Sequence, residues 1–265
     1  MSQSLTGMAR VEAGMVRVAP LQHLPGLLAE TGLAIEPLLD EVGLPRNALS
    51  HPENTIPVAA GARLLALCAE RSQRPHFGLM AGQKVMPASL GLIGMLILNS
   101  PTVGQALRGL ILTLHLNGRA VVPSLIVRDG AAALSLAPFG SYGSGGRQVA
   151  DFTIAVACNL MRALCGPRWM PSEVQLAHRA PDDQRPYRQF FKAPLRFSSE
   201  RTALLFPETW LAHHVSGADP QVRSTLQHGI AAILSQQDLS LLDKVRRALL
   251  RRRAHNQRFW LSYSI

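Results

Sequence analysis

Long apolar runs, cysteines and charged residues are all scarce in this sequence of 265 residues. Because no stretch reaches about 18 uninterrupted apolar residues, we do not expect a membrane-spanning helix. The three cysteines, Cys68, Cys158 and Cys165, are too few and too scattered for a disulfide framework. Residues 1–20 lack the apolar centre and cleavage pattern of a secretory signal. The sequence therefore predicts a cytoplasmic protein.

Charge is also unevenly placed. Charged residues make up 17% of the chain and hydrophobic residues 47%, a composition typical of a globular protein. The formal net charge is +10, but seven of the 27 basic residues follow Asp243, leaving 20 against 17 acidic ones. This C-terminal basic segment could contact DNA phosphates weakly, or its charges could simply be solvated. The candidate phosphate contacts are Arg246, Arg247, Arg251, Arg252 and Arg253.

Helical periodicity dominates the first half of the chain. Residues 1–20 show no clear period and predict a loose leader. Start and stop signals then delimit helices, such as Pro57 as a first helical residue and Ser100-Pro101-Thr102 before another helix. The predicted helices are Leu24–Glu30, Glu36–Val42, Val58–Arg71, Phe77–Gly82, Leu90–Leu98 and Val103–Leu116.

Strand patterns begin after Gly118. Val121–Arg128 and Ala131–Ala137 flank Asp129-Gly130, a strong signal for a β-hairpin. Pro123 restricts its strand to a sheet edge or to a start after the proline. Further strands are predicted at Val174–His178, Leu195–Phe197 and Ala203–Phe206, with an aromatic turn at 187–191, a helical turn at Pro207–His213 and helices at 220–234 and 241–252.

Helices followed by strands, without regular β-α-β alternation, predict an α+β fold. We expect a mostly helical domain with a small antiparallel or mixed sheet. The predicted division of the chain is a leader over residues 1–20, a domain over 21–236 and a linker with the start of a further helix over 237–265.

An apolar helix over Gln148–Cys165 is expected at the centre of the core, because apolar side chains surround it almost completely. Its polar residues fall on one stripe about 80° wide. This stripe is either a solvent-facing edge or the polar side of a small-molecule pocket, with Tyr187, Phe190 and Phe191 as an aromatic wall. The candidate ligand-binding residues are Gln148, Asp151, Asn159, Arg162, Tyr187 and Phe190.

Other chemistry finds little support. His213 and His214 are adjacent and point apart on a helix, and the other histidines lack partners at metal-ligand spacing. No Gly-x-Ser-x-Gly elbow is present, and Cys158 and Cys165 lie on an apolar face where we expect an inert thiol. The Gly-rich segment 139–146 could receive an anion but fits a flexible connector better. We therefore predict no cofactor, metal or catalytic residue.

Several motifs, in this order and spacing, resemble one family. They include Pro75-His76-Phe77-Gly78-Leu79, Ser100-Pro101-Thr102-Val103-Gly104, Gly166-Pro167-Arg168-Trp169 and Gly217-Ala218-Asp219-Pro220. The sequence resembles the N-terminal regulatory domain of AraC-type (AraC/XylS) bacterial transcription regulators, in the branch with an arabinose-binding-like effector domain that includes ornithine-utilisation regulators. The resemblance spans roughly residues 22–250 and implies a domain that binds an effector and dimerises.

Such regulators carry a C-terminal DNA-binding domain with two helix-turn-helix units. Val245–Leu250 resembles the opening helix of that domain, but the segment after Arg253 shows no helix-turn-helix pattern. We therefore expect a gene truncated or frameshifted near Arg253, or a product that works without a DNA reader. On this hypothesis the chain binds a small-molecule effector, forms homodimers or mixed dimers with an intact relative, and contacts promoter DNA only through a domain it lacks.

Two other functions stay open at this point. One is a stand-alone small-molecule-binding protein, which the missing reader favours and the remaining opening helix at 245–250 disfavours. The other is an enzyme acting on a small metabolite, which only the pocket hypothesis supports. Effector identity, and whether the protein activates or represses, do not follow from the residues.

Overall fold

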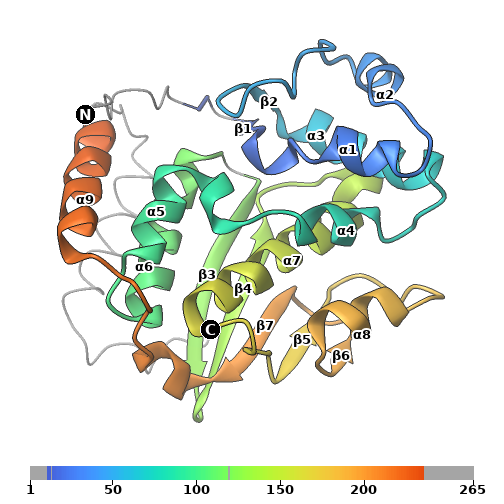
Figure 1. Ribbon diagram of the computed structural model, residues 1–265. Helices are drawn as coiled ribbons and strands as arrows, with labels where there is room; N and C mark the ends of the chain where they lie inside the picture. Colours follow the sequence, from blue (N-terminus) through green and yellow to red (C-terminus); the bar gives the residue numbers. More distant parts are fainter. Residues whose placement is uncertain (1–10, 13, 119, 236–265) are drawn as a thin grey trace.

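The computed structural model describes residues 11–12, 14–118 and 120–235. Helices and strands are combined in the predicted α+β arrangement. Figure 1 shows α7 (Gly146–Cys165) crossing the middle of the molecule, with the N-terminal helices on one side and the larger sheet on the other. The predicted helix at 241–252 and the proposed segment 237–265 lie outside the described residues.

The N-terminal part contains a two-stranded sheet and three α-helices. β1 (Met15–Arg17) pairs antiparallel with β2 (Thr55–Pro57), so that Val16 lies opposite Ile56. The prediction of a loose leader is therefore wrong for residues 15–20, because a three-residue strand is too short to show a period. The remaining elements are η2 (Ala19–Leu21), α1 (Leu24–Ala29), α2 (Glu36–Glu41) and α3 (Val58–Arg71).

Short helices form the middle of the chain, close to the predicted positions. Thr102 begins α6 as predicted, since its side-chain oxygen accepts a hydrogen bond from the Gln105 N–H at 3.3 Å. The elements are α4 (Phe77–Gln83), η3 (Pro87–Leu90), α5 (Leu92–Leu98), α6 (Val103–Thr113) and η4 (Leu114–Leu116).

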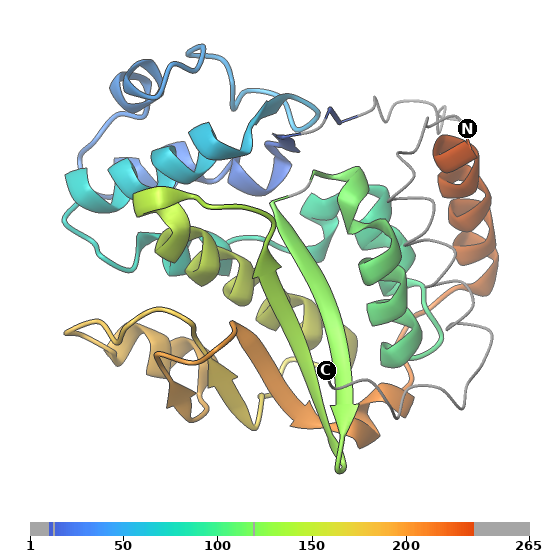
Figure 2. The ribbon, with the colours of Figure 1, turned by 180° about the vertical axis from the view of Figure 1, so that it is seen from behind.

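The larger sheet has five strands in the order β3-β4-β7-β5-β6. All pairs are antiparallel except β5 with β6, so the sheet is mixed. β3 lies at the edge, which confirms the restriction placed by Pro123. Figure 2 shows the long β3–β4 hairpin from behind. The strands are β3 (Val121–Arg128), β4 (Ala131–Pro138), β5 (Glu173–Gln175), β6 (Leu195–Arg196) and β7 (Ala203–Pro207).

The aromatic segment near residue 190 differs from its prediction as a turn. It forms a helix, α8 (Arg185–Phe191). Asp183 explains the difference, because its carboxylate accepts the Arg185 backbone N–H at 2.9 Å and satisfies the start of the helix. Pro186 fits the first turn, and Lys192 ends the helix in the left-handed conformation with φ of 53°.

Helix α7 is the centre of the packing. A Cβ added to Gly78 would lie 2.2 Å from the Gln148 carbonyl oxygen, and one added to Gly82 would lie 2.4 Å from that of Phe152. Only glycine allows α4 to approach the α7 backbone this closely. The segment Gly143–Cys165 is apolar and long enough to cross a membrane by length and composition, but 61% of its window is buried inside the protein.

Two clusters of buried apolar side chains share the interior. The N-terminal cluster comprises buried residues between Val18 and Ala81, together with Val149. The sheet cluster runs from Leu79 to Ile230 and contains the inner faces of the sheet, α5, α6 and most of α7. α9 (Pro220–Ser235) joins the sheet cluster through Leu226 and Ile230, after η6 (Glu208–Ala212). As predicted, Asp219 caps α9 by accepting the Gln221 N–H at 2.7 Å.

Candidate functional site

The polar stripe of α7 fixes α4 at both ends. Gln148 accepts the Gly78 backbone N–H at 2.7 Å and donates to the Pro75 carbonyl at 2.9 Å, at the start of α4. Asn159 donates from Nδ2 to carbonyl oxygens at the end of α4, with distances of 2.9 to 3.3 Å. These side chains satisfy backbone groups that a short helix leaves without partners.

The other two residues of the stripe, Asp151 and Arg162, contact α8 and the segment before it. Asp151 has an exposed fraction of 0% and accepts hydrogen bonds from the Tyr187 hydroxyl at 2.6 Å and from the His178 ring Nε2 at 2.8 Å. The Arg147 Nε lies 3.8 Å from the same carboxylate. Burial raises the pKa of the Tyr187 phenol well above its usual value, with the nearby Asp151 charge as the next cause. Tyr187 therefore stays a neutral donor.

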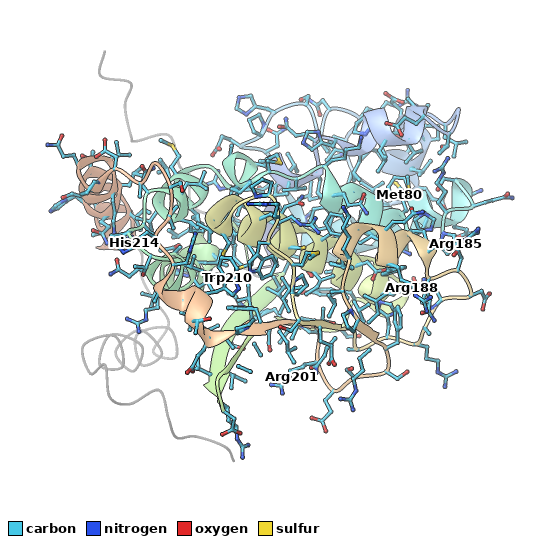
Figure 3. All side chains as sticks on the ribbon, turned by 60° about the horizontal axis from the view of Figure 1, so that its bottom comes forward. Met80, Arg185, Arg188, Arg201, Trp210 and His214 are labelled. Carbon is cyan, nitrogen blue, oxygen red and sulfur yellow. The ribbon has the colours of Figure 1, made fainter. Side chains whose placement is uncertain are left out.

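Arg162 contacts the far end of α8. Its guanidinium donates to the Phe190 carbonyl at 2.5 Å and lies 4.6 Å from the centre of the Phe190 ring. The Arg162 guanidinium thus makes both a hydrogen bond and a cation–π contact with Phe190. Figure 3 shows that Arg185 and Arg188, on the outer side of α8, lie toward the same end of the molecule as Met80, while Trp210 and His214 lie at the opposite end.

The interpretation of the stripe as a solvent-facing edge is wrong for Gln148 and Asp151, since both side chains are buried against other helices. The structure brings all six candidate ligand-binding residues together around α7, and protein groups already occupy many of their hydrogen-bonding atoms. Ligand binding by these residues stays a prediction. The candidate phosphate contacts at 246–253 lie outside the described residues.

An apolar cavity of about 130 Å³ lies on another side of α7. Val16, Arg17 and Pro20 of the N-terminal part line it, together with residues between Leu90 and Leu160. The apolar side chains that line it include Leu90, Leu110, Leu114, Leu136, Val156 and Leu160. The Thr153 hydroxyl, also in the wall, donates to the Val149 carbonyl of its own helix. The lining is thus suited to an apolar group.

A second, more polar cavity of about 450 Å³ adjoins the first. We call it the polar basin. Arg17, Leu90 and Asn117 line both spaces, so the two cavities are neighbours that share these residues. Arg17 is buried and forms an ion pair with Glu53, which also lines the basin. The basin is completed by Ala19, Gln22, His23, Pro52, Ala88, Ser89 and Gly91.

Asn117 is held rigidly where the cavities meet. The side-chain Nδ2 donates to the Leu90 carbonyl at 3.1 Å, and the backbone carbonyl of Asn117 accepts the Arg17 backbone N–H at 3.0 Å. The neighbouring Gly118 has φ of 130°, and a Cβ there would lie 2.8 Å from the Met15 carbonyl oxygen. Glycine is therefore required for the chain to pass so close to β1.

The oxygen Oδ1 of Asn117 is buried, and no donor among the described residues reaches it. The Asn117 residue as a whole has an exposed fraction of 8%. A buried polar atom without a partner is a candidate contact for a ligand or a bound water. The orientation of the amide is fixed, because a flipped amide would place Oδ1 against the Leu90 carbonyl.

Sequence reasoning missed Arg17 and Asn117. Arg17 stands in the segment predicted as a leader, and Asn117 follows the helix predicted over Val103–Leu116 without being singled out. A single charged residue between apolar neighbours at 15–18 was the one available signal for a short strand. No sequence signal places Asn117 beside Arg17, since the two are brought together by pairing over a long separation.

The cysteines fit the prediction of inert thiols. Burial raises the pKa of Cys68 and Cys165 to about 12, and that of Cys158 to about 11. Thiols with such pKa values carry almost no thiolate at neutral pH. Among the described residues, no group of three or more His, Cys, Asp or Glu side chains could hold a metal ion.

Comparison with known proteins gives the family. The family model described as the arabinose-binding domain of AraC transcription regulators, N-terminal, matches residues 32–215, which is more than half of the chain. The chain belongs to this family of effector-binding regulatory domains. The family assignment confirms the resemblance seen in the sequence.

Two individual proteins that resemble this chain are also transcription regulators, in agreement with the family assignment. The chain is 26% identical over 246 residues to the ornithine utilization regulator of Pseudomonas aeruginosa, covering 91% of this chain and 71% of the relative. Its fold is similar to the crystal structure of the transcriptional regulator CdpR from Pseudomonas aeruginosa, with a TM-score of 0.55 and 14% identity. That alignment covers 89% of this chain and 80% of CdpR and supports the fold.

Proposed function

We propose that this chain is the effector-sensing part of an AraC-type transcription regulator and that the effector binds where the apolar cavity meets the polar basin. The single observation that carries the proposal is the buried, unpartnered Oδ1 of Asn117 at this junction. The two spaces together fall in the range of about 300–1,000 Å³ that is usual for small-molecule sites.

The location of the cavity supports a sensing role. Its walls come from β1 and η2 of the N-terminal part and from α6, β4 and α7 of the sheet part. A ligand that contacts both parts stabilises one relative arrangement of them over others. A DNA-binding domain attached to such a regulator would respond to this change. The sensing domain on this proposal begins by Met15 rather than at residue 21, because Val16 and Arg17 line the site.

Partners follow from the family as proposals. We infer that the chain pairs with itself or with an intact relative, that promoter DNA is read by helix-turn-helix units of the regulator, and that it acts in the cytoplasm. Co-expression with a tagged intact relative tests the pairing, because mixed dimers would co-purify in a ratio near one to one. Absence of both self-association and co-purification would contradict it. We propose no catalytic step.

The names of the relative and of the family suggest two compounds to include in a screen for the effector. The relative's name contains ornithine, and the family description names arabinose. A thermal-shift screen of the purified full chain against amino acids, sugars and organic acids tests the function directly. A ligand at about 100 times its Kd stabilises the folded state by about 2.7 kcal/mol.

The screen is followed by two measurements on any compound that raises the Tm. Isothermal titration measures its Kd for the chain and for the Asn117→Ala variant, whose affinity we expect to be lower. Incubation with the compound tests for turnover, which would point to an enzyme instead. If no compound in the three classes binds, the proposal of a small-molecule sensor is wrong.

A further inference from the structure

We propose that the effector is an apolar α-amino acid, bound with its side chain in the apolar cavity and its ammonium and carboxylate groups in the polar basin. This inference rests on the proposed function and adds the chemical class of the ligand. It combines one unpartnered acceptor, the balance of charge in the basin and the size and lining of the apolar cavity.

Asn117 defines one group of the ligand. Its Nδ2 is committed to the Leu90 carbonyl, so the buried acceptor Oδ1 is the atom of this amide that is left without a partner, in a residue that lines both cavities. A ligand must therefore bring a donor to this point. An ammonium group has three N–H donors, and a hydrogen bond from a charged donor is stronger than one from a neutral donor. The Glu53 carboxylate in the basin wall supplies a second acceptor and a negative charge.

The charges of the basin define the net charge of the head group. The basin wall carries one cationic side chain, Arg17, and one anionic side chain, Glu53, which form an ion pair, and His23 also lines the basin. A head group with one positive and one negative charge complements this pair. A ligand with a net charge would leave one charge uncompensated near a partly buried site, which lowers affinity.

The apolar cavity defines the rest of the ligand. A cavity of about 150 Å³ lined by Leu, Ile and Phe holds one benzene molecule in another protein. The cavity here, of about 130 Å³, therefore has room for a branched aliphatic chain or a small ring. The ammonium-bearing end of ornithine's side chain would lie among mostly apolar side chains there, such as Leu110, Leu136 and Val156, and would lose its hydration. A sugar would bury hydroxyl groups without partners, each lowering affinity about tenfold.

The experiment uses the full chain and four compounds. L-leucine carries both required parts, and 4-methylpentanoate is the same molecule without its ammonium group. L-ornithine keeps the head group but has a charged side chain, and L-arabinose lacks an apolar end. Isothermal titration should give L-leucine the lowest Kd, with the other three at least about 100-fold weaker.

Two variants place the ligand. Asn117→Ala should weaken L-leucine about tenfold and leave 4-methylpentanoate unchanged, because only the ammonium group uses Oδ1. Val156→Phe puts a ring into the apolar cavity and should abolish binding of L-leucine. Ala163→Phe, on an exposed face of α7 outside the cavity, is the matched control and should bind L-leucine like the wild type.

The outcomes separate the two proposals. If L-ornithine or L-arabinose binds more tightly than L-leucine and both site variants weaken it, the ligand class is wrong and the sensor proposal stands. If L-leucine binds but neither variant changes its Kd, the assignment of this ligand to the joint cavity is overturned. If none of the four compounds binds, the amino-acid proposal fails. The wider metabolite screen then decides the sensor proposal separately.

Discussion

Gln148 and Asn159, on one face of α7, bind the backbone at opposite ends of α4. Gln148 satisfies the Gly78 N–H and the Pro75 carbonyl, and Asn159 satisfies the carbonyls of Gly82, Gln83 and Val85. The seven residues of α4 are too few for a stable isolated helix. Side chains of α7 therefore stabilise α4.

Asn159→Asp should lower the free energy of unfolding by about 2–4 kcal/mol. The carboxylate keeps the size of the amide but cannot donate, so it faces three carbonyl oxygens without a hydrogen bond. Urea denaturation measures the change. Asn47→Asp, at an exposed position, is the control and should change the stability by less than about 0.5 kcal/mol. Equal effects at the two positions would show that Asn159 does not hold α4.

Gly78→Ala should destabilise the protein by about 3 kcal/mol or more, because its Cβ would lie 2.2 Å from the Gln148 carbonyl oxygen and force α4 away from α7. Gly26→Ala in α1 is the matched control. No atom lies within 4 Å of a Cβ at residue 26, and alanine favours the helix, so this change should stabilise by about 0.4–1 kcal/mol. Thermal unfolding of both variants checks the opposite signs.

Tyr187→Phe should lower the stability by about 1.5–3 kcal/mol, since it removes a donor to the buried Asp151 carboxylate. The same change in an Asp151→Asn background should have a smaller effect. A double-mutant cycle gives the coupling. Tyr142→Phe, which removes a hydrogen bond to the neutral Ala120 carbonyl, should lower the stability by only about 0.5–1.5 kcal/mol. A coupling near zero would contradict the role of Asp151.

Stability should depend on pH through His76. Burial lowers the pKa of His76 from its ordinary value of 6.5, and the charge of Arg74 adds to the effect. The unfolded chain therefore takes up this proton at a higher pH than the folded protein does. The contribution of neutral His76 to the free energy of unfolding is complete above pH 6.5. It is lost as the pH falls through the pKa of His76 in the folded protein.

Unfolding by urea at several pH values between about 5 and 7.5 measures this dependence. The His76→Gln variant should lose less stability than the wild type as the pH falls through this interval. His214→Gln, at an exposed position, is the control and should follow the wild type. A His76→Gln variant with the same slope as the wild type would show that another group causes the pH dependence.

The sequence by itself determined the local elements. Helical periodicity and the start signal at Pro57 predicted the observed limits of α3 (Val58–Arg71), and the Asp129-Gly130 pair predicted the β3–β4 hairpin. These signals are local, because they depend on residues within one or two turns of each other. Among the elements they missed, β1 and β2 are short and depend on each other as distant partner strands, and α8 begins next to Asp183, whose carboxylate accepts the Arg185 N–H.

Only the tertiary structure decided the site. The stripe of α7 was visible in the sequence, but a stripe has the same pattern whether it faces water, a ligand or two helices. Its partners, the backbone of α4 and the side chains around α8, lie far from it in the chain. Likewise Arg17 and Asn117 meet through pairing between segments a hundred residues apart. Burial and hydrogen bonding depend on what packs against a residue, so the unpartnered Oδ1 of Asn117 could be recognised only in the folded protein.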